Sequence, residues 1–156
     1  MYNYHDTAIR KERVRLGTDH CDSDGPVFEL DALLRDGLLW DPRHPEVLLE
    51  SERSTIIFAI GDAHRFRIGF DGMRGHPSAV KHETLFHNAN VLAAGELHVK
   101  SGVIVDLNDH SGSYRTYGKL DADPGFARAL LEAAGLLGVP MSDRLRRKLR
   151  RRKGRE

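Results

Sequence analysis

Residues 95–108 read GELHVKSGVIVDLN, two segments of alternating apolar and polar residues on either side of a short polar turn. Such alternation is typical of a β-hairpin with one buried face. A three-residue loop, Lys100–Gly102, with Gly102 in the left-handed conformation, keeps the apolar side chains of both arms on one face. We therefore predict this loop and the pairs that it sets: Val99 with Val103, Leu97 with Val105, and Gly95 with Leu107.

This register places the carboxylates of Glu96 and Asp106 opposite each other, with His98 beside them on the outward face. Two opposed carboxylates are unfavourable unless something neutralises them. Three arrangements would do so: an acid pair with separated pKa values for general acid–base chemistry, a patch that binds a divalent metal, or an arginine between the acids. We favour an arginine from a neighbouring strand, supplied by Arg65, Arg67 or Arg115.

Two further strands precede this hairpin. Residues 55–60 are β-branched and apolar, as in a buried strand. Residues 64–70 alternate, with Phe66, Ile68 and Phe70 on the inward face, so the two segments form a second hairpin. Residues 82–87 are another strand candidate. The Pro- and Gly-containing stretches 41–53 and 71–81 are predicted as loops.

Helices are predicted on both sides of the sheet. Before it, residues 28–36 place Leu30, Leu33 and Leu34 on one helical face, with Pro26 able to open the helix and Gly37 to end it. After it, Asp123 caps a helix that Pro124 begins and Gly138 ends. The inward stripe of this second helix consists of Phe126, Leu130, Ala133 and Leu137.

The predicted fold is therefore α+β, with a small, mostly antiparallel sheet of about five or six strands within residues 54–118 and flanking helices. Residues 1–140 form a single domain, and residues 141–156 form a basic tail. Ser142 can cap a last helix, but Leu145 and Leu149 are its only apolar anchors. We expect the last ten residues to fray unless a partner holds them.

Composition excludes several classes of protein. The chain of 156 residues is too short for two ordinary domains, and Cys21, its single cysteine, excludes an intrachain disulfide and a cysteine-rich zinc site. No apolar run is long enough to span a membrane, and the first residues lack the pattern of a Sec-type signal peptide. We expect a cytoplasmic protein, or one exported by a route without such a signal.

Four pieces of the sequence form an ordered signature: His82–Phe86, Leu92–Gly95, Gly102 and Ser111–Arg115. In order and spacing this set resembles the C-terminal region of plant IQ-motif-containing (IQM) calmodulin-binding proteins and of related fungal and bacterial proteins, some of them effector- or toxin-like. The resemblance covers residues 54–140. Calmodulin binding is not carried over, because the chain has no glutamine and hence no IQ motif. Departures from the signature are Glu83 and Thr84 for two serines, Ser113 for a histidine, and Thr116 for a proline.

The resemblance implies a fold and the place of a site, but no reaction. We expect a domain that binds a small ligand or a protein partner in a pocket lined by His, Ser and Tyr. The hydroxyls and backbone N–H groups of the Ser-Gly-Ser-Tyr bend can cradle an anion. Alternatively, these residues only satisfy buried backbone groups. The predicted binding residues are His82, Thr84, Gly95, Ser111, Gly112, Ser113 and Tyr114.

A second hypothesis is an effector- or toxin-type enzyme that acts on a nucleotide such as NAD, in the manner of an ADP-ribosyltransferase. Its catalytic residues would be His82, Glu96, Tyr114 and Arg115. NAD is the one cofactor considered, and only under this hypothesis. No metal site is predicted, because the nine histidines show no His-x3-His pair.

The charge is divided unevenly along the chain. Residues 144–156 carry nine basic residues and one acid, a net charge of +8, which leaves −7 on the rest. Such a block is usually a solvated or interacting tail, and here it can also fold back on the acidic body. Alternatively, the tail binds nucleic acid, an acidic groove or a membrane surface. We rank nucleic acid second, with Arg146, Arg147, Arg150 and Arg151 as its contact residues.

Overall fold

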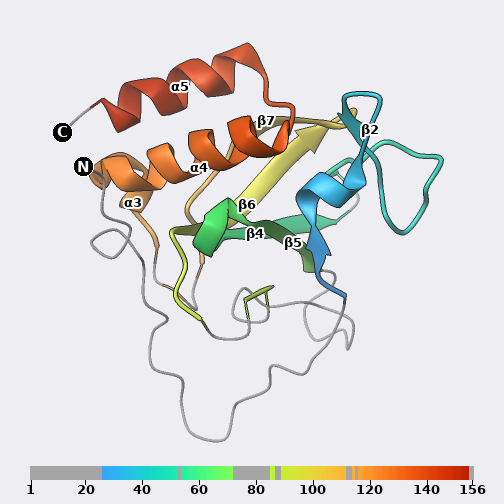
Figure 1. Cartoon of the computed structure of the whole chain (residues 1–156), viewed down its shortest axis with the longest axis horizontal. Coiled ribbons are helices and arrows are strands. Elements are labelled where there is room, and N and C mark those ends of the chain that lie inside the picture. Colours follow the sequence, from blue (N-terminus) through green and yellow to red (C-terminus); the bar gives the residue numbers. More distant parts are fainter. Residues whose placement is uncertain are drawn as a thin grey trace, which may run out of the picture.

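The sheet has five strands in the order β1-β5-β4-β6-β7, and neighbouring strands all run antiparallel (Figure 1). The computed structural model describes residues 26–52, 54–71, 85–86, 89–111, 114 and 116–154. Three helices follow the sheet, which confirms the predicted α+β class. The strands are β1 Phe28–Glu29, β4 Thr55–Ile60, β5 Phe66–Asp71, β6 Ala93–Lys100 and β7 Val103–Leu107, and the helices are α3 Lys119–Ala122, α4 Pro124–Leu137 and α5 Asp143–Lys153.

The hairpin of β4 and β5 lies at the centre of the sheet, as predicted. Thr55 pairs with Asp71 and Ile60 with Phe66, and the short 3₁₀ helix η2 (Asp62–His64) joins the two strands. The inward alternation is confirmed, because Phe66, Ile68 and Phe70 are all buried. This hairpin therefore provides a large part of the apolar core.

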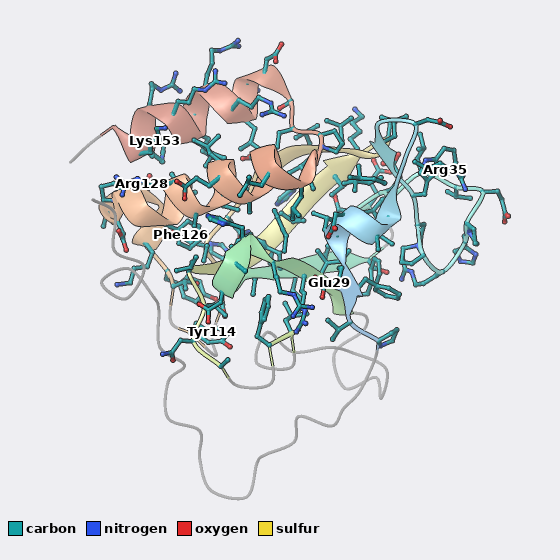
Figure 2. All side chains as sticks on the ribbon, viewed as in Figure 1. Glu29, Arg35, Tyr114, Phe126, Arg128 and Lys153 are labelled. Carbon is teal, nitrogen blue, oxygen red and sulfur yellow. The ribbon has the colours of Figure 1, made fainter. Side chains whose placement is uncertain are left out.

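Helix α4 packs against β4 and β6, with Phe126 on its side toward the sheet (Figure 2). The predicted boundaries are confirmed. The Asp123 carboxylate accepts the Gly125 N–H at 2.9 Å, Pro124 opens the helix, and Gly138 ends it with a φ of 73°. A cap, a proline in the first turn and a left-handed glycine are the local signals that set such ends.

The turn between β6 and β7 differs from the prediction. It contains two residues, Ser101 and Gly102, with φ values of 50° and 77°, the geometry of a type I′ hairpin. Lys100 then pairs with Val103. A β-bulge at Val105 shifts the register, so that Leu97 faces Leu107 and His98 faces Asp106. The prediction of a three-residue loop is therefore wrong. A two-residue turn alone would place apolar residues of the two strands on opposite faces, but the bulge brings them back to one face.

The predicted helix over residues 28–36 is also wrong. Only Leu30–Leu33 is helical, as one 3₁₀ turn (η1), and it lies between β1 and a small hairpin. That hairpin consists of β2 Leu34–Arg35 and β3 Leu38–Leu39, joined by Asp36 and Gly37 with φ values of 54° and 77°. Asp-Gly is a preferred pair for such a turn, and so short a segment cannot nucleate an isolated helix. The helices α3, α4 and α5 all follow the sheet.

Helix α5 is formed from Asp143 to Lys153, where fraying was expected. The Ser142 hydroxyl accepts the Leu145 N–H at 3.2 Å, as predicted for a cap. Leu145 and Leu149 are 1% and 0% exposed, and α5 packs on α4 and β7. The segment before α5 also bonds to β7, with the Ile104 N–H donating to the Pro140 carbonyl. The two leucines therefore enter the core of the domain.

Candidate functional site

Gly95 lies under the crossing of another chain segment. A Cβ at this position would overlap the Asn108 carbonyl oxygen and lie 3.1 Å from the Asp109 Cα. We call residues 108–116 the signature turn; its first residues, Asn108 and Asp109, pass directly over β6. Of this turn the structure describes 108–111, Tyr114 and Thr116.

The described polar groups of the signature turn bond within the protein. The Thr116 hydroxyl lies 2.5 Å from the Asp109 carbonyl oxygen and 3.1 Å from that of Ala94. The Asp109 carboxylate accepts the Leu120 N–H at 2.9 Å, and the Ser111 hydroxyl accepts the Tyr114 N–H at 3.3 Å. These groups satisfy buried backbone atoms, which matches the alternative that they are structural.

Tyr114 is buried and contributes to the core rather than to an open surface. Its side chain is 2% exposed, and its hydroxyl donates to the Ala89 carbonyl at 2.9 Å. A buried phenol normally has such a partner. The predicted residues His82, Thr84, Gly112, Ser113 and Arg115 lie outside the described residues. The pocket lined by His, Ser and Tyr therefore stays a prediction, as does the NAD hypothesis that shares His82 with it.

Glu96 bonds to the first residue of the signature turn. Its Oε1 accepts a hydrogen bond from Asn108 Nδ2 at 2.9 Å and lies 3.9 Å from His110 Nδ1. Asn108 Oδ1 in turn accepts the backbone N–H groups of Glu96 and His110. An amide between the strand and the turn thus orients this carboxylate.

The predicted opposition of Glu96 and Asp106 is wrong, because the bulge moves Asp106 opposite His98. Two of the three candidate bridging arginines lie elsewhere: Arg65 and Arg67 both bond to Glu29, at 2.8 and 2.6 Å. The third, Arg115, lies outside the described residues. Lysine, not arginine, neutralises Asp106, since Lys148 Nζ lies 3.0 Å from its Oδ1.

The pKa of Asp106 reflects this partner. Partial burial raises the pKa, but the hydrogen bond from Lys148, the Leu107 N–H and the positive charges of Lys148 and His98 together hold it below its usual value. Asp106 therefore remains ionised under neutral conditions and ties α5 to the sheet. A second ion pair, Arg152 to Asp121 of α3 at 2.7 Å, ties the other half of the helix.

Five other basic residues of α5 are exposed. In Figure 2 most side chains on the outer side of α5 end in nitrogen and point away from α4. Within the described part of the chain no ion pair involves five of the basic residues, all of them exposed. We call the eight described basic residues of the helix the cationic surface of α5: Arg144, Arg146, Arg147, Lys148, Arg150, Arg151, Arg152 and Lys153; the five exposed residues are Arg144, Arg147, Arg150, Arg151 and Lys153.

A groove of about 680 Å³ lies between this surface and β7. Sequence reasoning missed its floor, which consists of Val105 and Asp106 at the bulge. The basic side of the groove has helical spacing, a signal that could have been read from the sequence. Its lining residues are Val105, Asp106, Ser142, Arg144, Leu145, Lys148, Arg151 and Arg152.

Other kinds of site are not found in the described residues. No three or more His, Cys, Asp or Glu side chains of these residues gather as metal ligands would. None of the described helices has the length and apolar character needed to cross a membrane. Comparison with protein-family models, curated proteins and solved structures gives no match. The resemblance to IQM proteins therefore stays an expectation.

Proposed function

We propose that this domain binds nucleic acid by its phosphates, through the cationic surface of α5. The observation that carries the proposal is the division of this helix into two faces. Leu145 and Leu149 are buried, whereas Arg144, Arg147 and Arg151 are exposed. The helix thus holds its position by its apolar side and offers its guanidinium groups to solvent.

The division of α5 into a buried apolar face and an exposed basic face also disfavours two other binding partners of basic helices, a membrane surface and the groove of a partner protein. A helix that lies in a membrane interface inserts a free apolar face, and a helix that binds in a protein groove presents apolar anchors. Both leucines of α5 are already at most 1% exposed. The surface therefore offers charge and hydrogen-bond donors without an apolar face.

The chemistry of the donors supports phosphate as the ligand. Six of the eight described basic residues of α5 are arginines. The guanidinium group presents donors in a planar fork that fits phosphate oxygens with two parallel hydrogen bonds. Lys148 and Arg152 hold the helix against Asp106 and Asp121, so the other cations are spaced on a fixed support.

The test is the salt dependence of binding. A fluorescently labelled 20-nucleotide strand and the duplex of the same sequence are titrated with the protein between 50 and 200 mM salt. Each phosphate contact contributes about −0.9 to the slope of log affinity against log salt on duplex DNA, so four or five contacts give a slope of about −4. Binding without this dependence, or no binding to either probe, overturns the proposal.

A matched pair of variants localises the contact. Arg151→Gln removes an exposed cation of α5 and retains good helix propensity. It is expected to weaken binding and to reduce the salt slope by about one. Lys100→Gln removes an exposed cation from the end of β6 and is expected to change neither. Equal effects of the two variants would mean that net charge, and not this helix, attracts the probe.

A further inference from the structure

Tyr117 and His110 form an exposed pair of stacked rings beside the signature turn. Their centroids are 4.8 Å apart and their planes differ by 23°. Tyr117 is 64% exposed, and it is the only described Phe, Tyr or Trp side chain in the exposed class. The His110 side chain is 50% exposed. A large flat surface that the fold does not bury is available to a ligand.

Hydrogen bonds at or next to both residues hold their backbone in place. Tyr117 follows Thr116, whose buried hydroxyl bonds to backbone carbonyls of the signature turn and β6. The His110 N–H donates to Asn108 Oδ1 at 2.9 Å, and its ring lies 3.9 Å from the Glu96 carboxylate. The stacked pair is thus held in place before any ligand binds, which lowers the entropic cost of binding.

The pair also lies close to the cationic surface of α5. Arg152 bonds to Asp121, only four residues after Tyr117. Because consecutive Cα atoms are 3.8 Å apart, Tyr117 and Asp121 are separated by no more than about 15 Å. Lys148 bonds to Asp106, two residues before Asn108. Two ion pairs therefore join the helix to β7 and α3, at positions four residues along the chain from His110 and Tyr117.

We propose that the ligand of this surface is a single-stranded nucleic acid, with its phosphates on α5 and an unpaired base stacked on Tyr117. The inference rests on the proposed function and specifies its substrate class. Proteins that bind single strands combine a positive groove with an aromatic side chain on which a base stacks. A duplex hides the faces of its bases, so the ring pair offers it nothing. Charge and an available aromatic face together favour the single strand.

The experiment compares a labelled 12-nucleotide oligothymidine strand with a mixed-sequence 12-base-pair duplex. Tyr117→Ala is expected to weaken binding of the single strand about tenfold. Its salt slope is expected to stay unchanged, because no phosphate contact is lost. Duplex binding is expected to stay unchanged as well. Tyr117→Phe retains the flat ring and is expected to bind like the parent protein, which separates stacking from loss of the phenol.

The control is Leu136→Ala, which removes a 70%-exposed apolar side chain from α4 and is expected to change neither affinity. Equal affinity for strand and duplex, with no effect of Tyr117→Ala, overturns the single-strand inference and leaves phosphate binding intact. Absence of salt-dependent binding to either probe overturns both proposals. Binding to phosphatidylserine vesicles in place of both oligonucleotides overturns both as well and identifies an anionic membrane as the ligand.

Discussion

The signature turn and α5 contain the two groups of polar residues from which the sequence predicts binding sites. The polar groups of the turn are buried, whereas most cations of α5 are exposed. In the turn, Ser111, Tyr114 and Thr116 bond to neighbouring backbone and lie buried. In α5, Arg144 and Arg151 extend from the surface. The availability of a polar group, more than its residue type, therefore decides whether it can bind a ligand.

Side-chain length explains the difference. A serine or threonine hydroxyl reaches only nearby backbone, and a turn packed over a buried strand has carbonyls that must be satisfied. An arginine places its charge several bonds from the backbone, so its stem can pack on the protein while its head remains in water. Short hydroxyls thus stabilise the crossing over Gly95, and long cations cover the outside of α5.

The strongest test of a structural signature turn is Gly95→Ala. The new methyl group would overlap the backbone carbonyl of Asn108, which no side-chain rotation can relieve. We expect a loss of more than about 3 kcal/mol, at or beyond the upper end of ordinary overpacking costs. Urea unfolding measures the effect.

Gly135→Ala is the matched control for this substitution. Gly135 lies inside α4, and a Cβ there would meet nothing within 4 Å. Alanine in a helix interior is favoured over glycine by about 0.5–1 kcal/mol, so a slight gain in stability is expected. If Gly95→Ala proved as harmless as Gly135→Ala, the turn would not pass over β6 as described.

The docking of α5 is tested next by Leu149→Ala. Leu149 is fully buried, and truncation of such a side chain costs about 2–5 kcal/mol. We expect a lower midpoint in urea and faster tryptic cleavage at the arginines of α5. Leu136→Ala, at an exposed position of α4, should stay within about 0.5 kcal/mol of the parent protein. Similar stability of the two variants would instead support the frayed tail that composition indicates.

Much of the fold follows from local patterns. Residues 55–60 were predicted as a strand because they are β-branched and apolar, and residues 64–70 because apolar residues alternate there; β4 and β5 lie at these positions. The ends of α4 were predicted because Asp123, Pro124 and Gly138 act within one turn of the helix. In each case the residues that determine the element lie within it or directly beside it.

The wrong predictions concern elements whose structure depends on contacts between segments far apart in the sequence. The bulge at Val105 depends on the pairing of β6 with β7 and on the tip at Gly102, whose N–H and carbonyl bond to Leu49 and Leu39. Phe28 and Glu29 become a strand because β5 has an edge to pair. The same applies to the candidate site. Helical spacing predicts a row of cations, but only the packing of α5 on β7 places Asp106 beside Lys148.

The smallest expected effect concerns that last contact. The pKa of Asp106 is lowered in the folded protein, so its ionised form stabilises the fold above its unfolded pKa of about 3.9. This stabilisation is lost as the pH falls through the lower folded value. We expect Asp106→Asn to cost less than about 1 kcal/mol at pH 7, since the side chain is about half exposed. The cost should vanish at a pH below the folded pKa of Asp106, where both proteins carry a neutral group at this position.

Urea unfolding of parent and variant at both pH values measures this difference, and the titration of Asp41 cancels because both proteins contain it. Lys148→Gln, alone and combined with Asp106→Asn, completes a double-mutant cycle for the pair. Additive losses, or a cost of Asp106→Asn that persists below the folded pKa of Asp106, would show that the ion pair does not hold α5. The helix would then depend on its two buried leucines, and its outward charges would be more loosely spaced than the proposed contact with phosphates requires.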